Sequence, residues 1–87
     1  MKRRRTKNRV AVAQVLLRAP DGRHWAYDIA KALDLVPAKV MTVLKAMRED
    51  GWLTVEWEDP EKVTGRPPRR YYTLTDLGRA HLPRLAR

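Results

Sequence analysis

Cysteine is absent from this sequence, so the chain can hold neither a disulfide framework nor a zinc site built on cysteine ligands. A lack of cysteine also fits a protein that works in a reducing cytosol. No apolar run approaches the roughly 18 residues that a helix needs to span a bilayer. The basic start, Met1–Arg5, is not followed cleanly by the apolar segment and cleavage site of a signal peptide. We therefore expect a soluble cytoplasmic protein with no membrane contact.

Acidic residues are scarce as well. Ten Asp and Glu stand against nineteen Lys and Arg, which gives a formal net charge of +9 at pH 7. So large an excess in a short chain predicts a polyanionic partner, most often nucleic acid. Hydrophobic residues make up 44% of the 87 positions, enough for one small domain with a modest core. No internal repeat or linker divides the chain, so we expect a basic arm over residues 1–5 and one domain over residues 6–87.

The segment 36–52 carries the clearest helical pattern. Its apolar residues recur at i, i+3, i+4 and i+7, as on one face of a helix, at Val40, Val43, Leu44 and Met47. Pro37 suits the first turn and Gly51 the left-handed position after the last turn, while Val36 lacks a capping side chain, at a cost of about 1 kcal/mol. The opposite face is basic. The pattern predicts a helix over Pro37–Asp50 that packs behind and binds nucleic acid in front, although a merely solvated basic face would show the same period.

Two shorter helices precede this one. Thr6 can cap a first helix that ends near Arg18 and is apolar nearly all round, which indicates more than one packing partner. Pro20–Gly22 ends that helix with strong turn chemistry. Residues 23–27 could form a brief strand that pairs with a later hairpin, and a second helix follows over Tyr27–Leu33. A tight turn then leads into the longer basic helix, which is the pattern of a helix-turn-helix.

The apolar period changes from 3.6 to 2 after Gly51. Alternation over Trp52–Glu58 and again over Arg69–Leu74 predicts two strands. The segment between them, Asp59–Pro68, is rich in proline, glycine and charge, so we expect a loop. Together these segments form a hairpin with a long basic tip, which we term the wing.

The last element begins at Thr75, a good helix cap. Pro83 removes a helical N–H and disfavours helix at Leu82, so this helix should stop or kink there. The whole series predicts an α+β, mostly helical fold. It is a winged helix-turn-helix with three helices, a two-stranded β-wing and a short C-terminal helix.

Twelve residues are candidates for contact with DNA. Those on the exposed side of the main helix are Ala38, Lys39, Met41, Thr42 and Lys45. Those on the wing are Arg66, Pro67, Arg69 and Arg70. The remaining three, which would meet phosphates, are Tyr27 at the start of the second helix and Arg4 and Arg5 in the arm.

Each group has a physical rationale and an alternative. Thr42 can meet a thymine methyl and a lysine can reach guanine O6 or N7, although phosphate contact is the commoner fate of lysine. Arginine suits a narrow minor groove, where the negative potential is strongest. The wing arginines could instead pair with the acidic residues of the same hairpin, Glu56, Glu58, Asp59 and Glu61. Tyr27 could be a packed structural residue, and the basic arm a solvated tail.

Other features carry less functional information. The three tryptophans, Trp25, Trp52 and Trp57, are expected in the core or a subunit contact, and a stacking platform for single strands is the rarer alternative. His24 and His81 have no acidic or cysteine cluster beside them, so we expect no metal site. No nucleophile with a base, no paired carboxylates in a cleft and no phosphate-binding glycine loop is visible. We therefore expect neither an enzyme nor a cofactor.

The segment DGWLTVEWEDPEKVTGRPPRRYYTLTDLGR, residues 50–79, resembles the wing region of the PadR family of transcriptional regulators. The specific string is GRP at 65–67 followed by the tyrosine pair at 71–72, Leu74-Thr75 and Gly78-Arg79. Residues 26–29, AYDI, are similar to the family's G-Y-E-I at the start of its second helix. The resemblance covers roughly residues 10–82 and implies a winged-helix DNA-binding repressor, typically a dimer.

The sequence departs from the family at its C-terminal end. The resemblance implies a long terminal helix that builds the dimer, but only Arg79–Arg87 follow the motif, with Pro83 among them. A homodimer through the first helix and this C-terminal stub, or a monomer that pairs only on DNA, are both compatible with the sequence. The presence of a small-molecule inducer is equally open.

These observations predict a sequence-specific double-stranded DNA-binding transcriptional regulator, a repressor associated with the nucleoid. Helix 37–50 would read the major groove and the wing, residues 59–70, the minor groove or backbone of a palindromic operator. An alternative with the same fold is an architectural or accessory module that assembles with other proteins on plasmid or phage DNA. RNA binding is a third possibility, marked by preference for single strands or A-form duplex.

Overall fold

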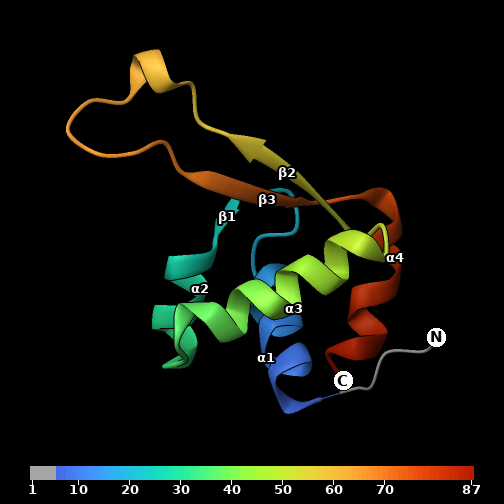
Figure 1. Ribbon diagram of the computed structural model, residues 1–87. Helices are drawn as coiled ribbons and strands as arrows, with labels where there is room; N and C mark the ends of the chain where they lie inside the picture. Colours follow the sequence, from blue (N-terminus) through green and yellow to red (C-terminus); the bar gives the residue numbers. More distant parts are fainter. Residues whose placement is uncertain (1–5) are drawn as a thin grey trace.

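A computed structural model describes residues 6–87 of the chain (Figure 1). The elements follow in the order α1 (Lys7–Leu17), β1 (His24–Trp25), α2 (Ala26–Leu33), α3 (Pro37–Glu49), β2 (Leu53–Trp57), the 3-10 turn η1 (Pro60–Lys62), β3 (Arg70–Leu74) and α4 (Asp76–Leu85). They confirm the α+β, mostly helical winged helix-turn-helix. Up to the end of β3, the bounds of the predicted helices and strands agree with the structure to within two residues.

The helix ends follow the local chemistry of the sequence. The Thr6 hydroxyl accepts the N–H of Arg9 at 3.2 Å, as a cap should. Gly51 takes a φ of +82° after α3, the left-handed conformation that glycine adopts without strain. Val36 makes no side-chain cap bond to α3. Asp34 ends α2 at a φ of +53°, a region that few residues other than glycine enter, and this bend aims α3 across α2.

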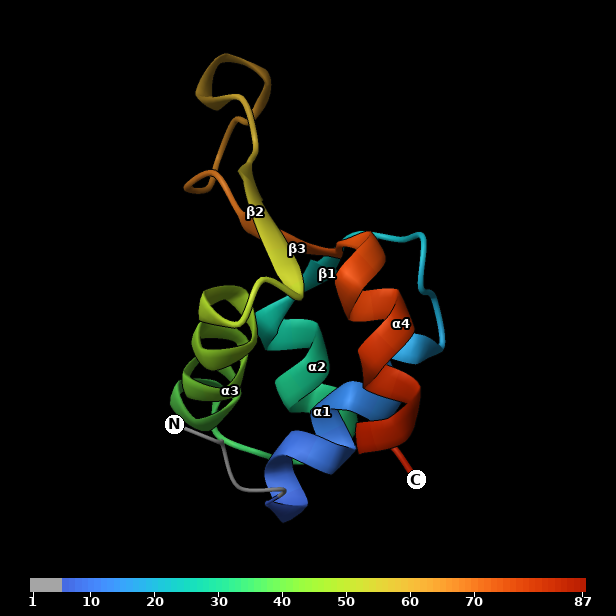
Figure 2. The ribbon, with the colours of Figure 1, turned by 90° about the vertical axis from the view of Figure 1, so that its right-hand side faces the viewer.

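The sheet has three antiparallel strands in the order β1-β3-β2. β1 is only two residues long and pairs with the middle of β3, so the brief strand predicted before α2 is confirmed. Along β3 the side chains alternate as expected: Tyr72 and Leu74 are buried, whereas Tyr71 and Thr73 are only half-buried. β2 and β3 continue outward beyond the helices as the wing (Figures 1 and 2).

One cluster of buried apolar side chains joins the helices to the inner face of the sheet. α1 packs against α2, α3 and α4 at once (Figure 2). α1 and α3 each supply three fully buried residues, which in α3 are Val40, Leu44 and Met47. Contacts on three sides explain why α1 is apolar nearly all round. Arg9 is buried beside this cluster, 3.8 Å from the carboxylate of Asp50 and 5.4 Å above the ring of Trp52, and it ties α1 to the end of α3.

Two outcomes were predicted at Leu82, an end of the helix or a kink, and the first is wrong because α4 continues through Pro83 to Leu85. Proline in a helix interior costs about 3 kcal/mol because a hydrogen bond is lost and its ring crowds the preceding turn. Leu82 is fully buried, and the Ala86 N–H donates to the Leu82 carbonyl at 2.9 Å. Burial of Leu82 and the hydrogen-bonded last turn offset the cost of the exposed proline.

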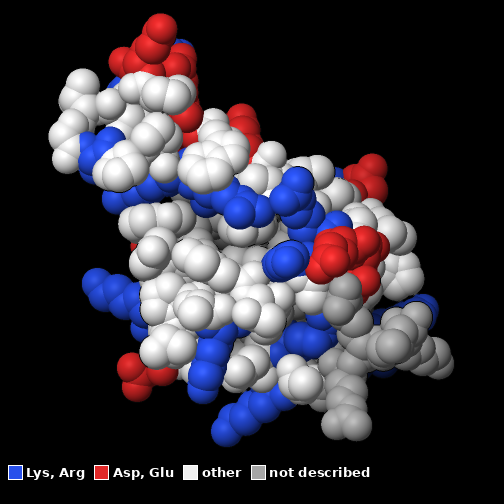
Figure 3. Space-filling model, in the orientation of Figure 1, with Lys and Arg blue, Asp and Glu red and all other residues white. Residues whose placement is uncertain are grey.

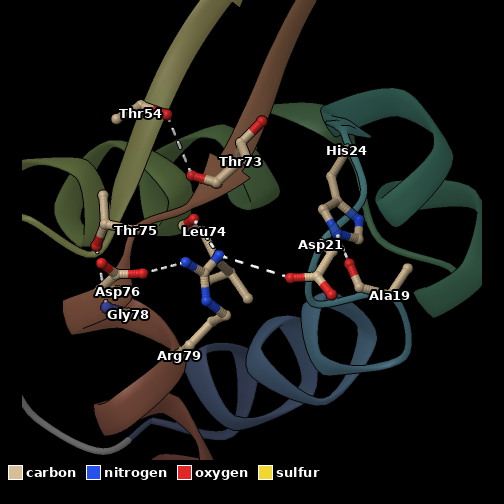
Figure 4. A network of polar contacts seen from close by, with 10 residues as sticks. All are labelled: Ala19, Asp21, His24, Thr54, Thr73, Leu74, Thr75, Asp76, Gly78 and Arg79. Atoms are coloured by element: carbon tan, nitrogen blue, oxygen red, sulfur yellow. Dashed lines mark hydrogen bonds and ion pairs between the residues drawn. The ribbon is translucent and has the colours of Figure 1, made fainter.

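The start of α4 is fastened to the sheet and to the loop before β1 (Figure 4). Thr75 caps the helix by accepting the N–H of Gly78 at 3.0 Å. Arg79 donates to the carbonyl of Leu74 at 3.0 Å and forms ion pairs with Asp76 and, at 3.8 Å, with Asp21. These contacts hold the C-terminal end of β3 against the helices and so fix the base of the wing.

Candidate nucleic-acid interface

The outer face of α3 carries the residues that the helical period placed there. Ala38, Lys39, Met41, Thr42 and Lys45 are all exposed, and the apolar residues of the opposite face are all buried. The Thr42 hydroxyl donates to the carbonyl of Ala38 at 2.9 Å. In this conformation its oxygen can still accept a hydrogen bond from a ligand, but its proton is already used.

One carboxylate organises the tip of the wing. Glu58 accepts two hydrogen bonds from the Arg66 guanidinium, at 2.7 and 3.1 Å, and a third from the backbone N–H of Arg69 at 2.8 Å. The Arg66 hydrogen bond, followed by that of Arg69, lowers the pKa of Glu58 to about 2. Arg66 also donates to the carbonyl of Pro67 at 3.1 Å. We refer to Glu58, Arg66 and the Arg69 N–H as the wing staple.

The three wing arginines differ in their contacts within the folded chain. For Arg66, the pairing with an acidic residue of the same hairpin is present. Arg69 and Arg70 instead contact rings: the Arg69 guanidinium lies 3.8 Å from the ring centroid of Trp25, and that of Arg70 lies 5.2 Å from Tyr72. Within residues 6–87, the side chains of Arg69 and Arg70 make no hydrogen bond, and their Nε atoms are buried without a partner.

A groove of about 880 Å³ separates α3 from the wing. Its walls include five cationic side chains, Lys45, Arg48, Arg66, Arg69 and Arg70. The walls also include four aromatic side chains, Trp25, Tyr27, Trp57 and Tyr72. Figure 3 shows Lys and Arg side chains in a row along the edge of the wing that faces α3, while acidic side chains gather at the wing tip. The groove therefore lies between the two elements predicted to touch DNA, and its charge is positive.

The structure brings most of the predicted contact residues to this one face. Met41, Lys45, Arg66, Pro67, Arg69, Arg70 and Tyr27 all line the groove. Tyr27 is 49% exposed and lies 5.0 Å from the ring of Trp25, so it is not a packed core residue. Ala38, Lys39 and Thr42 lie on the exposed side of α3 outside the groove lining. Arg4 and Arg5 fall outside the described residues.

Six residues of the groove were not among the predicted contacts, and two of them, Arg48 and Trp57, are the exposed ones that sequence reasoning missed. Arg48 follows Lys45 by three positions on α3, so the helical period would have been sufficient to include it. Trp57 was expected in the core or in a subunit contact, but it is 64% exposed, and the expectation that it belongs to the core is wrong. Its alternation with Leu53 and Val55 placed it on the inner face of β2, but the strand has left the helices behind at that point.

The described part of the chain has neither a cluster of metal ligands nor a membrane-spanning helix. Among residues 6–87, no three His, Asp or Glu side chains gather where they could hold a metal ion. Over the same residues, no helix combines the length and apolar character that a membrane crossing requires.

Comparisons with known proteins give a consistent result. The model of the transcriptional regulator PadR-like family matches residues 21–84, well over half of the chain. No curated protein sequence matches.

Solved structures share the fold. A PadR family transcription regulator from Clostridium difficile is 22% identical, with a TM-score of 0.72 over 90% of this chain and 81% of its own. A PadR-like transcription factor from Bacteroides fragilis is 27% identical, with a TM-score of 0.69 over 91% of this chain and 79% of its own. The adhesin competence repressor of Streptococcus pyogenes is 21% identical, with a TM-score of 0.69 over 92% of this chain and 54% of its own.

Proposed function

This chain belongs to the transcriptional regulator PadR-like family and is a DNA-binding transcription regulator rather than an enzyme, and we propose that it represses transcription by occupying a specific duplex sequence. In this proposal α3 enters the major groove and the wing follows the adjacent minor groove or backbone. The single observation that supports it best is the concentration of cationic side chains on α3 and along the wing edge that faces it.

The two elements have different tasks in this proposal. Lys39 and Thr42 sit on the part of α3 that projects outside the groove lining, where base edges would be within reach. Lys45 and Arg48, deeper along the helix, face the wing and would meet the phosphates of the strand between the two grooves. Arg66 is held by Glu58, so its positive charge is offset locally, and it would support the wing backbone against DNA.

We also propose a homodimer that matches a palindromic operator. α1 and α4 pack side by side, and the Gln14 side chain donates to the carbonyl of Ala86 at 3.0 Å. The first helix and the C-terminal stub therefore form one continuous surface, with half-buried Val10 and Ala11 beside it. Sedimentation of the free protein and of its complex with a selected duplex tests this proposal: two chains per duplex are expected, and one chain would contradict it.

Selection from random duplexes tests sequence-specific binding. A sharp, two-fold symmetric motif is expected. Weak binding without a motif, together with strong capture of other proteins, would contradict the repressor and favour an accessory module. Because phosphate contacts dominate such binding, affinity for the selected duplex should fall steeply with salt.

Substitutions then separate base contacts from phosphate contacts. Arg48→Ala should weaken binding about equally for all duplexes and reduce the salt slope by about one. Thr42→Ala should instead relax the preference at one base position. Lys31→Ala serves as the matched control, because Lys31 is an exposed cation on α2 that does not line the groove. If all three variants bind the selected duplex like the parent chain, the assignment of faces is wrong.

A further inference from the structure

Exposed apolar side chains converge on the groove between α3 and the wing. Within residues 6–87, five large apolar side chains are exposed, and three of them, Tyr27, Met41 and Trp57, line this groove. A protein in water gains by covering such surface. Binding to an intact duplex does not use ring faces, because the outside of a duplex offers phosphates, sugars and base edges, while the base faces are stacked on one another.

The aromatic rings of the groove differ in how much of their surface is accessible to a ligand. The ring of Trp25 is covered by the Arg69 guanidinium at 3.8 Å, and Tyr72 is buried. Trp57 is 64% exposed and Tyr27 is 49% exposed, so these two present ring surface to an incoming group. A planar aromatic ligand would therefore find its stacking partners in Trp57 on the wing and Tyr27 on α2.

The charge of the groove selects an anionic ligand. Its lining contains five Lys and Arg side chains and no Asp or Glu. Arg69 and Arg70 are half-buried, and their side chains make no hydrogen bond among residues 6–87. A ligand would meet the terminal nitrogens of each guanidinium, because the Nε atoms are buried. Phosphate oxygens are strong acceptors for guanidinium groups. Planar rings beside unpaired arginines together match a nucleobase with its phosphate, and the volume of about 880 Å³ leaves ample room for one nucleotide.

We propose that this groove binds unpaired nucleotides of a DNA strand, with a base stacked on Trp57 and Tyr27 and its phosphates on Arg69 and Arg70. The proposal rests on the proposed DNA binding but adds a second mode to it. The regulator would bind single-stranded or locally opened DNA through the groove, in addition to duplex through α3. Stacking of this kind tolerates different sequences, because every base has a ring face.

The test compares two single strands of equal charge. The full chain is titrated with a fluorescent ten-nucleotide oligothymidylate and with a decamer of the same backbone that lacks bases. If a base stacks in the groove, oligothymidylate should bind roughly 5- to 100-fold more tightly than the abasic strand, from the usual strength of one stacked base. Oligothymidylate should also quench tryptophan fluorescence, whereas the abasic strand should not.

Substitutions test whether Trp57 is responsible for the preference for oligothymidylate. Trp57→Ala should reduce the affinity for oligothymidylate to the level of the abasic strand and remove the quenching, whereas Trp57→Phe should retain much of the preference. Leu77→Ala is the matched control, because Leu77 is an exposed apolar residue on α4 outside the groove lining and should change neither. An oligothymidylate preference that survives Trp57→Ala, or no preference over the abasic strand, would overturn the proposal.

A parallel measurement of duplex binding distinguishes failure of this proposal from failure of the proposed function. Binding of a hairpin duplex by the unmodified chain, without preference for bases over the abasic strand, would refute only the groove. Absence of any duplex binding would refute the proposed function itself. A preference for oligothymidylate that Trp57→Ala abolishes, with duplex affinity changed by less than about twofold, would support both.

Discussion

The groove has two walls, and they are stabilised by different physics. α3 is held from behind by side chains that are almost wholly removed from water, among them Val40, Leu44 and Met47. The wing strands have three buried residues, Leu53, Tyr72 and Leu74, all in the inner part of the hairpin. Its outer part is ordered by the wing staple and by guanidinium–ring contacts.

This difference determines how strongly substitutions in each wall should affect the stability of the domain. Buried apolar contacts belong to the cooperative core, so damage behind α3 should lower the stability of the whole domain. Exposed ion pairs and ring contacts contribute little to global stability and mainly define local geometry. The outer part of the wing can therefore vary with little effect on folding, whereas the inner face of α3 cannot. The following substitutions test that contrast, from the largest expected effect to the smallest.

Leu44→Ala should have the largest effect. Leu44 is fully buried on the inner face of α3, and a leucine-to-alanine change in a core costs about 2–5 kcal/mol of unfolding free energy. Urea unfolding followed by circular dichroism measures the loss. Thr42→Ala, on the exposed face of the same helix, is the matched control and should stay within about 0.5 kcal/mol. Equal losses for the two variants would contradict the division of α3 into a buried and an exposed face.

Gly78→Ala should come next. A Cβ at this position would lie 2.2 Å from the carbonyl oxygen of Trp52, so α4 or the chain before β2 must shift. Overpacking of this kind costs about 1–3 kcal/mol, which thermal unfolding would detect. Gly22→Ala is the comparison, because its Cβ would come no closer than 3.3 Å to a neighbour, and it should change stability by less than about 1 kcal/mol. A neutral Gly78→Ala would show that α4 does not approach Trp52 so closely.

The wing staple should titrate at unusually low pH. The pKa of Glu58 is about 2 in the folded chain, below its ordinary value of 4.5, so its stabilising effect is complete above about pH 4.5 and is lost as the pH falls toward 2. Carbon NMR of the Glu58 carboxyl across this range measures the pKa directly. Arg66→Gln should move it upward toward 4.5. A carboxyl that titrates near 4.5 in the unmodified chain would show that the staple is not formed in solution.

Trp57→Ala should have the smallest effect on stability. Trp57 is 64% exposed, so its removal should change the unfolding free energy by no more than about 0.5 kcal/mol. Leu53→Ala, on the same strand but 3% exposed, should cost about 2–5 kcal/mol. If Trp57→Ala destabilises the domain as much as Leu53→Ala, the tryptophan is covered in solution and the contrast between the walls fails.

The helical part of the domain was predictable because its information is local. Four apolar residues at helical spacing, Pro37 at the start and Gly51 at the end were enough to define α3 and its two faces. The short strand β1 and the alternating burial of side chains along β3 were also predicted from local sequence. The persistence of α4 through Pro83 was not predictable from local rules, because it depends on burial of Leu82 against other elements.

The groove was less predictable, because it depends on how far each strand extends beyond the helices. Period-two alternation assigned Trp57 to the same face as Leu53, but it could not show that nothing covers that face at the outer end of β2. The choice of Glu58 as the partner of Arg66, among four acidic residues of the hairpin, depends on the path of the loop through η1. Neither property is encoded in periodicity.

The two-residue strand β1 has a consequence for the shape of DNA that this protein can accept. It pairs with β3 of the wing and continues directly into α2, which packs against α3. β1 and α2 therefore connect the wing to α3 and fix the separation between them. In the proposed docking, a duplex that contacts both α3 and the wing must bring one major and one minor groove to that spacing, so sequences that bend or narrow easily need the least deformation energy. Flexibility of the DNA, and not only the identity of its bases, then contributes to which site is occupied.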